Sequence, residues 1–88
     1  MYHKPGTLIE CVWGDAWSGN SWRTEQEIDH SPLKVTTIGY VIRHDKIGLS
    51  LSATKDGNGT YCGVCFRPAK MIESTRILSP AKRARKKK

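Results

Sequence analysis

The chain has 88 residues, three cysteines and a formal net charge of +7. This length excludes a second domain and limits the size of any buried core. No apolar run approaches the roughly 20 residues of a membrane-spanning helix, and residues 1–6 lack the apolar run of a signal peptide. An odd number of cysteines fits free thiols in a reducing compartment. We therefore expect a cytoplasmic protein without membrane contact.

Alternating apolar and β-branched residues predict five short strands. The first strand covers residues 7–13 and precedes a long connection, residues 14–32. Within this connection Thr24-Glu25-Gln26-Glu27 matches a capping box, which favours one helical turn over residues 25–29. The remaining strands are predicted over residues 34–43, 47–53, 60–66 and 74–78.

Glycine and proline mark the turns and bends between these strands. Gly39, in the middle of the second strand, predicts a bend or a bulge. The sequence Asp56-Gly57-Asn58-Gly59 predicts a hairpin, and a 3₁₀ turn is expected over residues 69–72, after Pro68. We expect the core to receive Ile47, Leu49, Leu51 and Ala53 from the third strand and Cys62, Val64 and Phe66 from the fourth.

These elements predict an all-β domain over residues 1–79. The strand order, the long loop after the first strand and the short turns favour a five-stranded SH3-like or Sm-like small barrel, whose closure would remove exposed strand edges. An OB-like barrel is the alternative. It requires a helix between its third and fourth strands, where this chain has only the turn at residues 56–59.

The basic charge is concentrated in the tail, residues 80–88. Residues 1–79 hold nine basic and eight acidic side chains, a net charge of +1 (9 − 8). Like charges repel along such a tail, so we expect it to be disordered and able to contact phosphate backbones without reading sequence. A merely solubilising terminus is the alternative. The candidate contacts are Lys82, Arg83, Arg85, Lys86, Lys87 and Lys88.

The three tryptophans, Trp13, Trp17 and Trp22, are separated only by small or polar residues. Because a core element would alternate its aromatic residues with aliphatic ones, we expect at least one indole to lie on a loop. A loop indole binds bases, rings or a partner's side chains. The alternative is a lid that folds back over the core.

Charged residues near the predicted loops complete a candidate ligand site. Carboxylates and an imidazole would lie on the loop side, and the basic residues would meet phosphate. Solvated surface charges are the alternative interpretation. The sequence contains no G-x-S-x-G, H-E-x-x-H or phosphate-loop motif, so we expect neither an enzyme nor a cofactor. The candidate ligand-binding residues are Trp17, Trp22, Asp15, Asp29, His30, Arg43, Arg67 and Lys70.

Cys62-Gly63-Val64-Cys65 has the spacing of half a zinc knuckle. In an extended strand, however, residues three apart point to opposite faces of the sheet, so the two thiols cannot share a metal. We expect no metal site.

Several short motifs, taken together, carry a resemblance to a known group of proteins. They are Val12-Trp13-x-Asp15-Ala16-Trp17, Asp29-His30-x-Pro32-Leu33-x-Val35-x-Thr37-x-Gly39-Tyr40-Val41-Ile42, Gly48-Leu49 and Pro68-x-x-Met71-Ile72. Over residues 7–78 the chain resembles small proteins of unassigned function encoded by tailed bacteriophages. The resemblance implies the cytoplasm of an infected bacterial host and a role in binding and blocking.

The expected function is that of a non-enzymatic phage accessory protein that counters a host defence. It would bind an anionic ligand such as a signalling nucleotide, or a nucleotide-handling host protein. The alternative is a DNA- or RNA-binding protein that uses the basic tail and exposed tryptophans. An enzyme built on the same loops is a third candidate. Edge strands of small barrels also allow a homo-oligomer.

Overall fold

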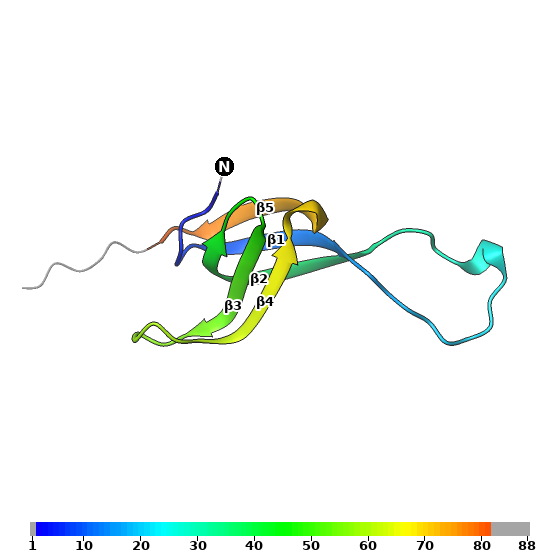
Figure 1. The fold of residues 1–88 in the computed structure, drawn as a ribbon, viewed down its shortest axis with the longest axis horizontal. Coiled ribbons are helices and arrows are strands. Elements are labelled where there is room, and N and C mark those ends of the chain that lie inside the picture. Colours follow the sequence, from blue (N-terminus) through cyan, green and yellow to red (C-terminus); the bar gives the residue numbers. More distant parts are fainter. Residues whose placement is uncertain (1, 82–88) are drawn as a thin grey trace, which may run out of the picture.

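The computed structural model describes residues 2–81 as one antiparallel sheet of five strands with two 3₁₀ turns (Figure 1). This confirms the predicted all-β class, and each predicted strand is present with its ends shifted by one or two residues. No helix in the described part of the chain has the length and hydropathy to cross a membrane. The elements are β1 (Leu8–Asp15), η1 (Glu25–Glu27), β2 (Leu33–His44), β3 (Gly48–Lys55), β4 (Tyr61–Pro68), η2 (Ala69–Met71) and β5 (Ile72–Ser79).

The strands follow the order β4-β3-β2-β1-β5, so β1 is a central strand and β4 and β5 are the two edges. Every neighbouring pair is antiparallel. The two edges are not paired with each other, so hydrogen bonds do not close this sheet into a complete barrel.

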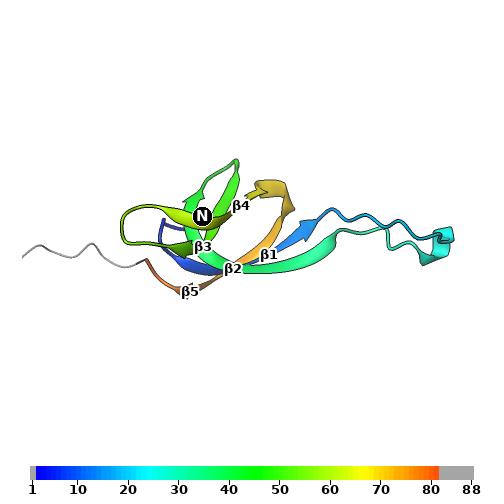
Figure 2. The same cartoon turned by 90° about the horizontal axis from the view of Figure 1, so that it is seen from below.

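The long strand β2 joins the two halves of the sheet and curves between them (Figure 2). It pairs with β1 from Leu33 to Tyr40 and with β3 from Tyr40 to His44. The register shift lies between Val41 and Arg43, slightly beyond the bend predicted at Gly39. Gly39 instead permits a close approach, since a Cβ atom there would lie 2.9 Å from the backbone oxygen of Ser52.

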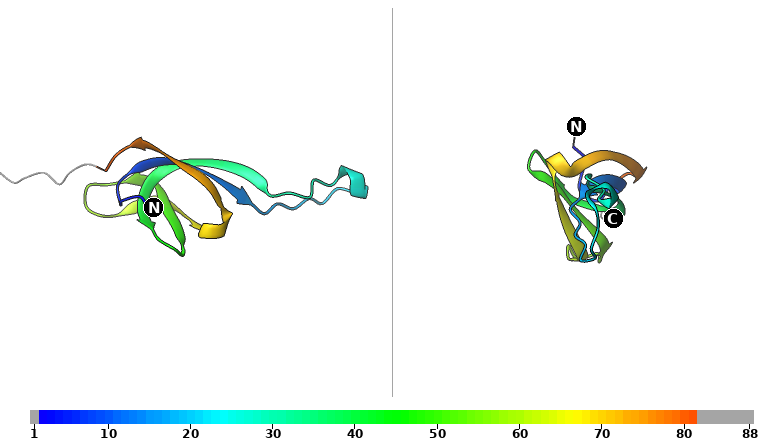
Figure 3. Two further views of the ribbon diagram at one scale, coloured as in Figure 1. Left: turned by 90° about the horizontal axis from the view of Figure 1, so that it is seen from above. Right: turned by 90° about the vertical axis from the view of Figure 1, so that its right-hand side faces the viewer.

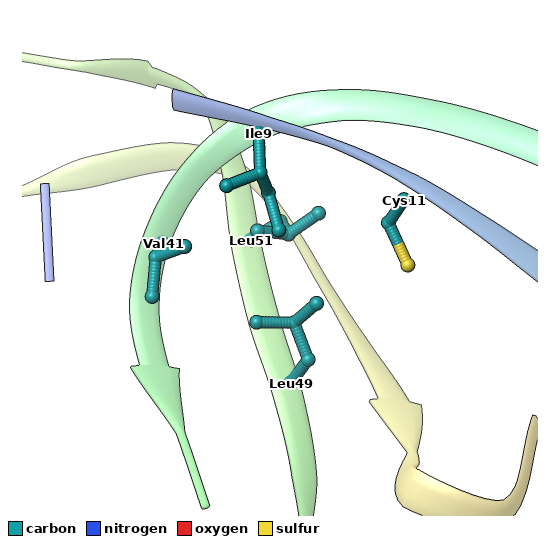
Figure 4. Packing of buried hydrophobic residues seen from close by; sticks show 5 residues of the cluster. All are labelled: Ile9, Cys11, Val41, Leu49 and Leu51. Atoms are coloured by element: carbon teal, nitrogen blue, oxygen red, sulfur yellow. The ribbon is translucent and has the colours of Figure 1, made fainter. Parts of the chain in front are cut away.

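A small apolar core lies on the inner face of the curved sheet (Figure 4). Trp13 and Ile72 pack against it from β1 and β5, and the Trp13 indole donates a hydrogen bond to the Thr37 hydroxyl (3.0 Å). Burial raises the pKa of the Cys11 thiol above its usual value, and the nearby Arg67 charge opposes this shift. The buried apolar side chains are Ile9, Cys11, Val41, Leu49 and Leu51.

The predicted inward face of β4 is wrong. Val64 and Phe66 lie opposite Ser52 and Ser50 on the outer face, and each is 54% exposed. Cys62, opposite Thr54, shares this outer side and is exposed. The inner positions of β4 are Cys65 and Arg67, which pair with the core residues Leu51 and Leu49.

Two residues of the third predicted strand also lie outside the core. Ile47 precedes β3 and is 64% exposed, and Ala53 is exposed as well. Of the four core residues predicted for this strand, Leu49 and Leu51 are buried.

The turn between β3 and β4 forms where it was predicted. The Asp56 carboxylate accepts hydrogen bonds from the backbone N–H groups of Asn58 (2.8 Å) and Thr60 (3.0 Å) and from the Thr60 hydroxyl. Together these bonds lower the pKa of Asp56 below its usual value. Gly59 has a φ of 87°, a conformation that favours glycine.

Residues 16–32, here called the arm, leave the sheet between β1 and β2 and project from one end of the molecule (Figure 3). The arm returns through η1, where the backbone N–H of Thr24 donates to the Glu27 carboxylate (3.0 Å), as the capping box predicts. The described residues therefore extend 67 Å in one direction but only 25 and 21 Å in the others.

The start of the chain and the end of β5 lie at the opposite end of the sheet from the arm (Figure 1). The backbone N–H of His3 donates to Nδ1 of His44 (3.0 Å), and His3 Nε2 lies 2.7 Å from the Thr75 hydroxyl. The tail predicted to be disordered lies outside the described residues from Lys82 onward.

Candidate functional site

An open groove of about 1360 Å³ lies where the arm joins the sheet. One wall is formed by residues 14–17, the end of β1 and the start of the arm. Residues 28–34, the returning part of the arm and the start of β2, form the opposite wall. Arg23 from the arm and Lys70, Met71 and Glu73 from η2 and β5 complete the lining.

The groove brings together five of the eight candidate ligand-binding residues. They come from three separate parts of the chain, which the pairing of β1 with β2 and with β5 places side by side. In particular, Asp15 pairs with Leu33, and Trp13 pairs with Ile72. The five residues are Asp15, Trp17, Asp29, His30 and Lys70.

Trp17 joins the two sides of the arm. Its indole N–H donates to the backbone oxygen of Ser31 (2.7 Å), and the residue is 39% exposed. This bond uses the only hydrogen-bond donor of the ring and holds the ring in place. What remains for a ligand is the flat apolar surface of the indole, which is suited to stacking.

The two carboxylates hold the backbone of the arm in shape. Asp15 accepts a hydrogen bond from the backbone N–H of Ala16 (2.8 Å), and Asp29 accepts one from the Ser31 hydroxyl (2.6 Å). Asp29 therefore orients Ser31, whose carbonyl in turn fixes Trp17. These contacts connect the charged side chains of the groove to its aromatic surface.

Cationic and anionic side chains are balanced around the groove. Lys34 lies 3.8 Å from the Glu73 carboxylate, and both side chains remain at least half exposed. Such an exposed pair is weak and leaves both groups free to rearrange around a ligand. Arg23 and the exposed Lys70 are the other cations of the lining.

From the sequence, Arg23 is a candidate anion contact for which a solvated surface charge is the favoured interpretation, and Lys34 is not a candidate. Lys34 lies opposite Gly14 in the β1–β2 pairing, so its place beside the arm follows from the strand register. Arg23 reaches the groove because the arm turns back at η1. No sequence motif marks either position.

Three candidate residues lie outside the groove. Trp22 is on the arm but is fully exposed, at 101%. Arg43, at the far end of β2, pairs with Asp45 at 2.8 Å. Arg67 is buried, at 1% exposure, with its guanidinium 5.0 Å from the centre of the Trp13 ring. Arg67 is thus a structural side chain in this conformation and does not face the groove.

The remaining candidate chemistry is spread over the molecule. Cys62 and Cys65 pair with Thr54 and Leu51, which point to opposite faces of β3. Within residues 2–81, no three histidine, cysteine, aspartate or glutamate side chains are placed to share a metal ion. The six candidate cations of the tail lie outside the described residues.

A second cluster of aromatic and titratable groups lies at the opposite end of the sheet. The rings of His3 and His44 stack with their centres 5.3 Å apart, and Tyr2 contacts His44 edge-on at 5.1 Å. Burial, together with the positive charges of His3 and the amino terminus, lowers the pKa of His44. This cluster attaches the first residues to β2 and β5 and is separate from the groove.

Comparison of this chain with protein-family models, with curated proteins and with solved structures finds no match to any of them. The groove at the base of the arm is therefore assigned from its own geometry and chemistry.

Proposed function

We propose that the groove at the base of the arm binds an anionic ligand with a planar aromatic part, such as a signalling nucleotide, without reacting with it. The observation that supports this most is the convergence of Trp17, Asp29, His30 and Lys70, from three separate chain segments, on one groove. An immobilised indole surface beside cationic side chains is the combination that nucleotide binding requires.

Each group has a distinct role in this proposal. The base stacks on Trp17, whose ring is held by Ser31. Lys70 and Arg23 meet the phosphate, because neither forms an ion pair with an acidic side chain within residues 2–81. Asp15 and His30 offer hydrogen bonds to sugar or base edges.

The biological setting follows from the resemblance to phage proteins. We propose an accessory protein that acts in the cytoplasm of an infected bacterium and counters a host defence by sequestering a nucleotide signal. A nucleotide-handling host protein is a second class of target, because an exposed indole and a mixed-charge rim also suit a protein surface.

We also propose that the fold is of the SH3-like small-barrel type. Two features support this: the order β4-β3-β2-β1-β5, and a long β2 that pairs with both halves of the sheet across a register shift. The β4–β5 side would be completed by side chains rather than by a ladder of hydrogen bonds.

The decisive experiment is calorimetric titration of the full chain with a panel of mono-, di- and cyclic nucleotides. We expect one class of nucleotide to bind. Trp17→Ala should weaken binding by about fivefold or more, because one base–aromatic stack contributes about 1–3 kcal/mol. Lys70→Gln should also weaken binding, whereas Lys46→Gln, an exposed cation in the turn before β3, should not.

Trp22→Ala provides the matched aromatic comparison. Trp22 is more exposed than Trp17 but does not line the groove, so its loss should leave nucleotide affinity unchanged. Equal losses in Trp17→Ala and Trp22→Ala, or no binding by any nucleotide of the panel, would contradict the proposal.

The alternative function is nucleic-acid binding by the tail together with Trp22. The full exposure of Trp22 and the six cations after Ala81 favour it. Under this alternative, deletion of residues 80–88 abolishes retention of DNA or RNA at physiological salt, and Trp22→Ala weakens it further.

A further inference from the structure

The outer edge of β4 is long, and the register of its pairing with β3 is constant. Residue pairing of β4 with β3 runs from Gly48–Pro68 to Lys55–Tyr61 without a register shift. On its other side, no strand among residues 2–81 pairs with β4. The unpaired N–H and C=O groups of such an edge form a template for one further strand.

The opposite edge, β5, carries features that hinder strand addition. Its pairing with β1 is irregular at both ends, with register shifts between Leu8 and Ile9 and between Val12 and Trp13. It also carries the charged residues Glu73 and Arg76. Bulges and charges of this kind protect an edge strand from association.

β4 shares neither the register shifts nor the exposed charges of β5, and its backbone departs from a strand conformation at Gly63, whose φ is 70°. Residues 61–66 contain no charged side chain and no proline. Arg67 is turned inward and is 1% exposed, and Pro68 ends the strand. An uncharged edge is what self-pairing needs, because identical charges would otherwise face one another across the symmetry axis.

The outer face of β4 is also apolar. Val64 and Phe66 project from it, and each is 54% exposed. Among residues 2–81 only five apolar side chains are buried, so the described part of the chain has a small core of its own. A second copy of β4 would cover part of this surface.

We propose that β4 is a homodimer interface, in which the β4 strands of two copies pair antiparallel about a two-fold axis at Cys65. In this register Val64 of each copy lies opposite Phe66 of the other, and the two Cys65 residues face each other. The cross-strand Cα distance is then about 4.5–5.5 Å. This lies within the range of about 4.4–6.8 Å that a disulfide bond spans.

The first test measures the mass of the full chain by sedimentation over a concentration series. We expect a concentration-dependent species of twice the 9.9 kDa chain mass. Val64→Lys should give the monomer, because it places a charge beside the symmetry axis. Ile38→Lys is the matched control, since Ile38 is 55% exposed but lies on the inner strand β2. It should leave the dimer intact.

The second test uses the exposed thiols as distance reporters. In the Cys62→Ser variant, copper–phenanthroline in air should join two chains through Cys65. Each disulfide releases two protons and two electrons, and the electrons pass to dioxygen. The Cys65→Ser variant keeps Cys62, which is also exposed but lies away from the axis, and should cross-link far less.

Three results would overturn the proposal. The first is a monomer at every concentration, and the second is equal cross-linking through Cys62 and Cys65. The third is loss of the dimer in Ile77→Lys but not in Val64→Lys, which would place the interface on β5. Nucleotide binding in the groove is measured separately, so its failure leaves these outcomes unaffected.

Discussion

The most unusual single residue of the sheet is the buried Arg67. Its guanidinium lies over the Trp13 ring and donates to the backbone oxygen of Cys65 (3.2 Å), while its Nε has no hydrogen-bond partner. Within residues 2–81, no acidic side chain forms an ion pair with it. The π face and the carbonyl thus compensate a charge that buried sites ordinarily neutralise with a carboxylate.

Gly48 provides the space in which this part of β4 packs. A Cβ atom at Gly48 would lie 2.2 Å from the backbone oxygen of Arg67 and 2.7 Å from the Phe66 ring. Gly48→Ala should therefore lower the free energy of unfolding by about 2 kcal/mol or more. Gly57→Ala, where a Cβ atom would meet nothing within 4 Å, should change it by less than about 0.5 kcal/mol. Denaturant titration of both variants makes the comparison.

His44 makes the attachment of the first residues dependent on pH. Its pKa is lowered in the folded protein, chiefly by burial, and its Nδ1 accepts the His3 N–H. The unfolded chain therefore binds the proton more readily, and stability should fall as the pH drops below about 6.5. Thermal unfolding between about pH 7.5 and pH 5.5 tests this, and the dependence should be reduced in His44→Gln. An unchanged pH profile in that variant would contradict the assignment.

Among the structural elements, the strands could be predicted because their pattern is local. In β3, Leu49 and Leu51 alternate with serines, and both are buried as predicted. In β4 the inner face was predicted incorrectly, because Val64 and Phe66 have the apolarity of core residues while Arg67 does not. Only the register with β3 decides which set points inward.

The groove could be predicted in part. Asp15, Trp17, Asp29 and His30 stand out in the sequence because a polar, tryptophan-rich segment surrounds them. The place of Lys70 beside them depends on the pairing of β5 with β1, which joins distant parts of the chain. Sequence patterns describe neighbours along the chain, so they do not predict which residues of different strands come into contact.

The arm is an element on which the folding of the sheet does not depend. Every residue from 16 to 32 is exposed, and Asp15 and Leu33 are already paired at its base. Replacing residues 16–32 by Asn-Gly should therefore preserve the fold, and shortening the loop should raise the unfolding free energy by about 1–2 kcal/mol. The same variant should lose nucleotide binding. Circular dichroism, denaturant titration and calorimetry check these outcomes, and a loss of cooperative unfolding would contradict them.

At the scale of the whole molecule, the groove and the start of the tail, at Pro80 and Ala81, lie at opposite ends (Figure 1). The arm projects at one end, and β5 runs away from it. Beyond the end of β5, the Cβ atom of Ala81 lies 3.7 Å from the place that a Cβ atom on Gly6 would occupy. The described residues extend 67 Å in the direction of the arm. A compact ligand in the groove therefore has no contact with the start of the tail.

We therefore expect the groove and the basic tail to act independently. Deleting residues 80–88 should leave the affinity of the groove for a nucleotide unchanged. It should also reduce the salt dependence of any nucleic-acid binding, by about 0.9 in the logarithmic slope for each phosphate that the tail had neutralised. Titrations of the full and shortened chains at several salt concentrations measure both quantities. A nucleotide affinity that falls with the tail would show that the two ends act together.

The projecting arm also sets where the polypeptide can be interrupted. Trypsin should cleave the native protein after the exposed Arg23, giving one piece that contains β1 and another that contains β2 to β5. β1 is hydrogen-bonded on both sides, to β2 and to β5. The two fragments of the cleaved protein should therefore stay associated, elute together on gel filtration and separate only in denaturant. The two pieces, expressed as separate polypeptides, should then reassemble by complementation, with the shorter one restoring the missing central strand.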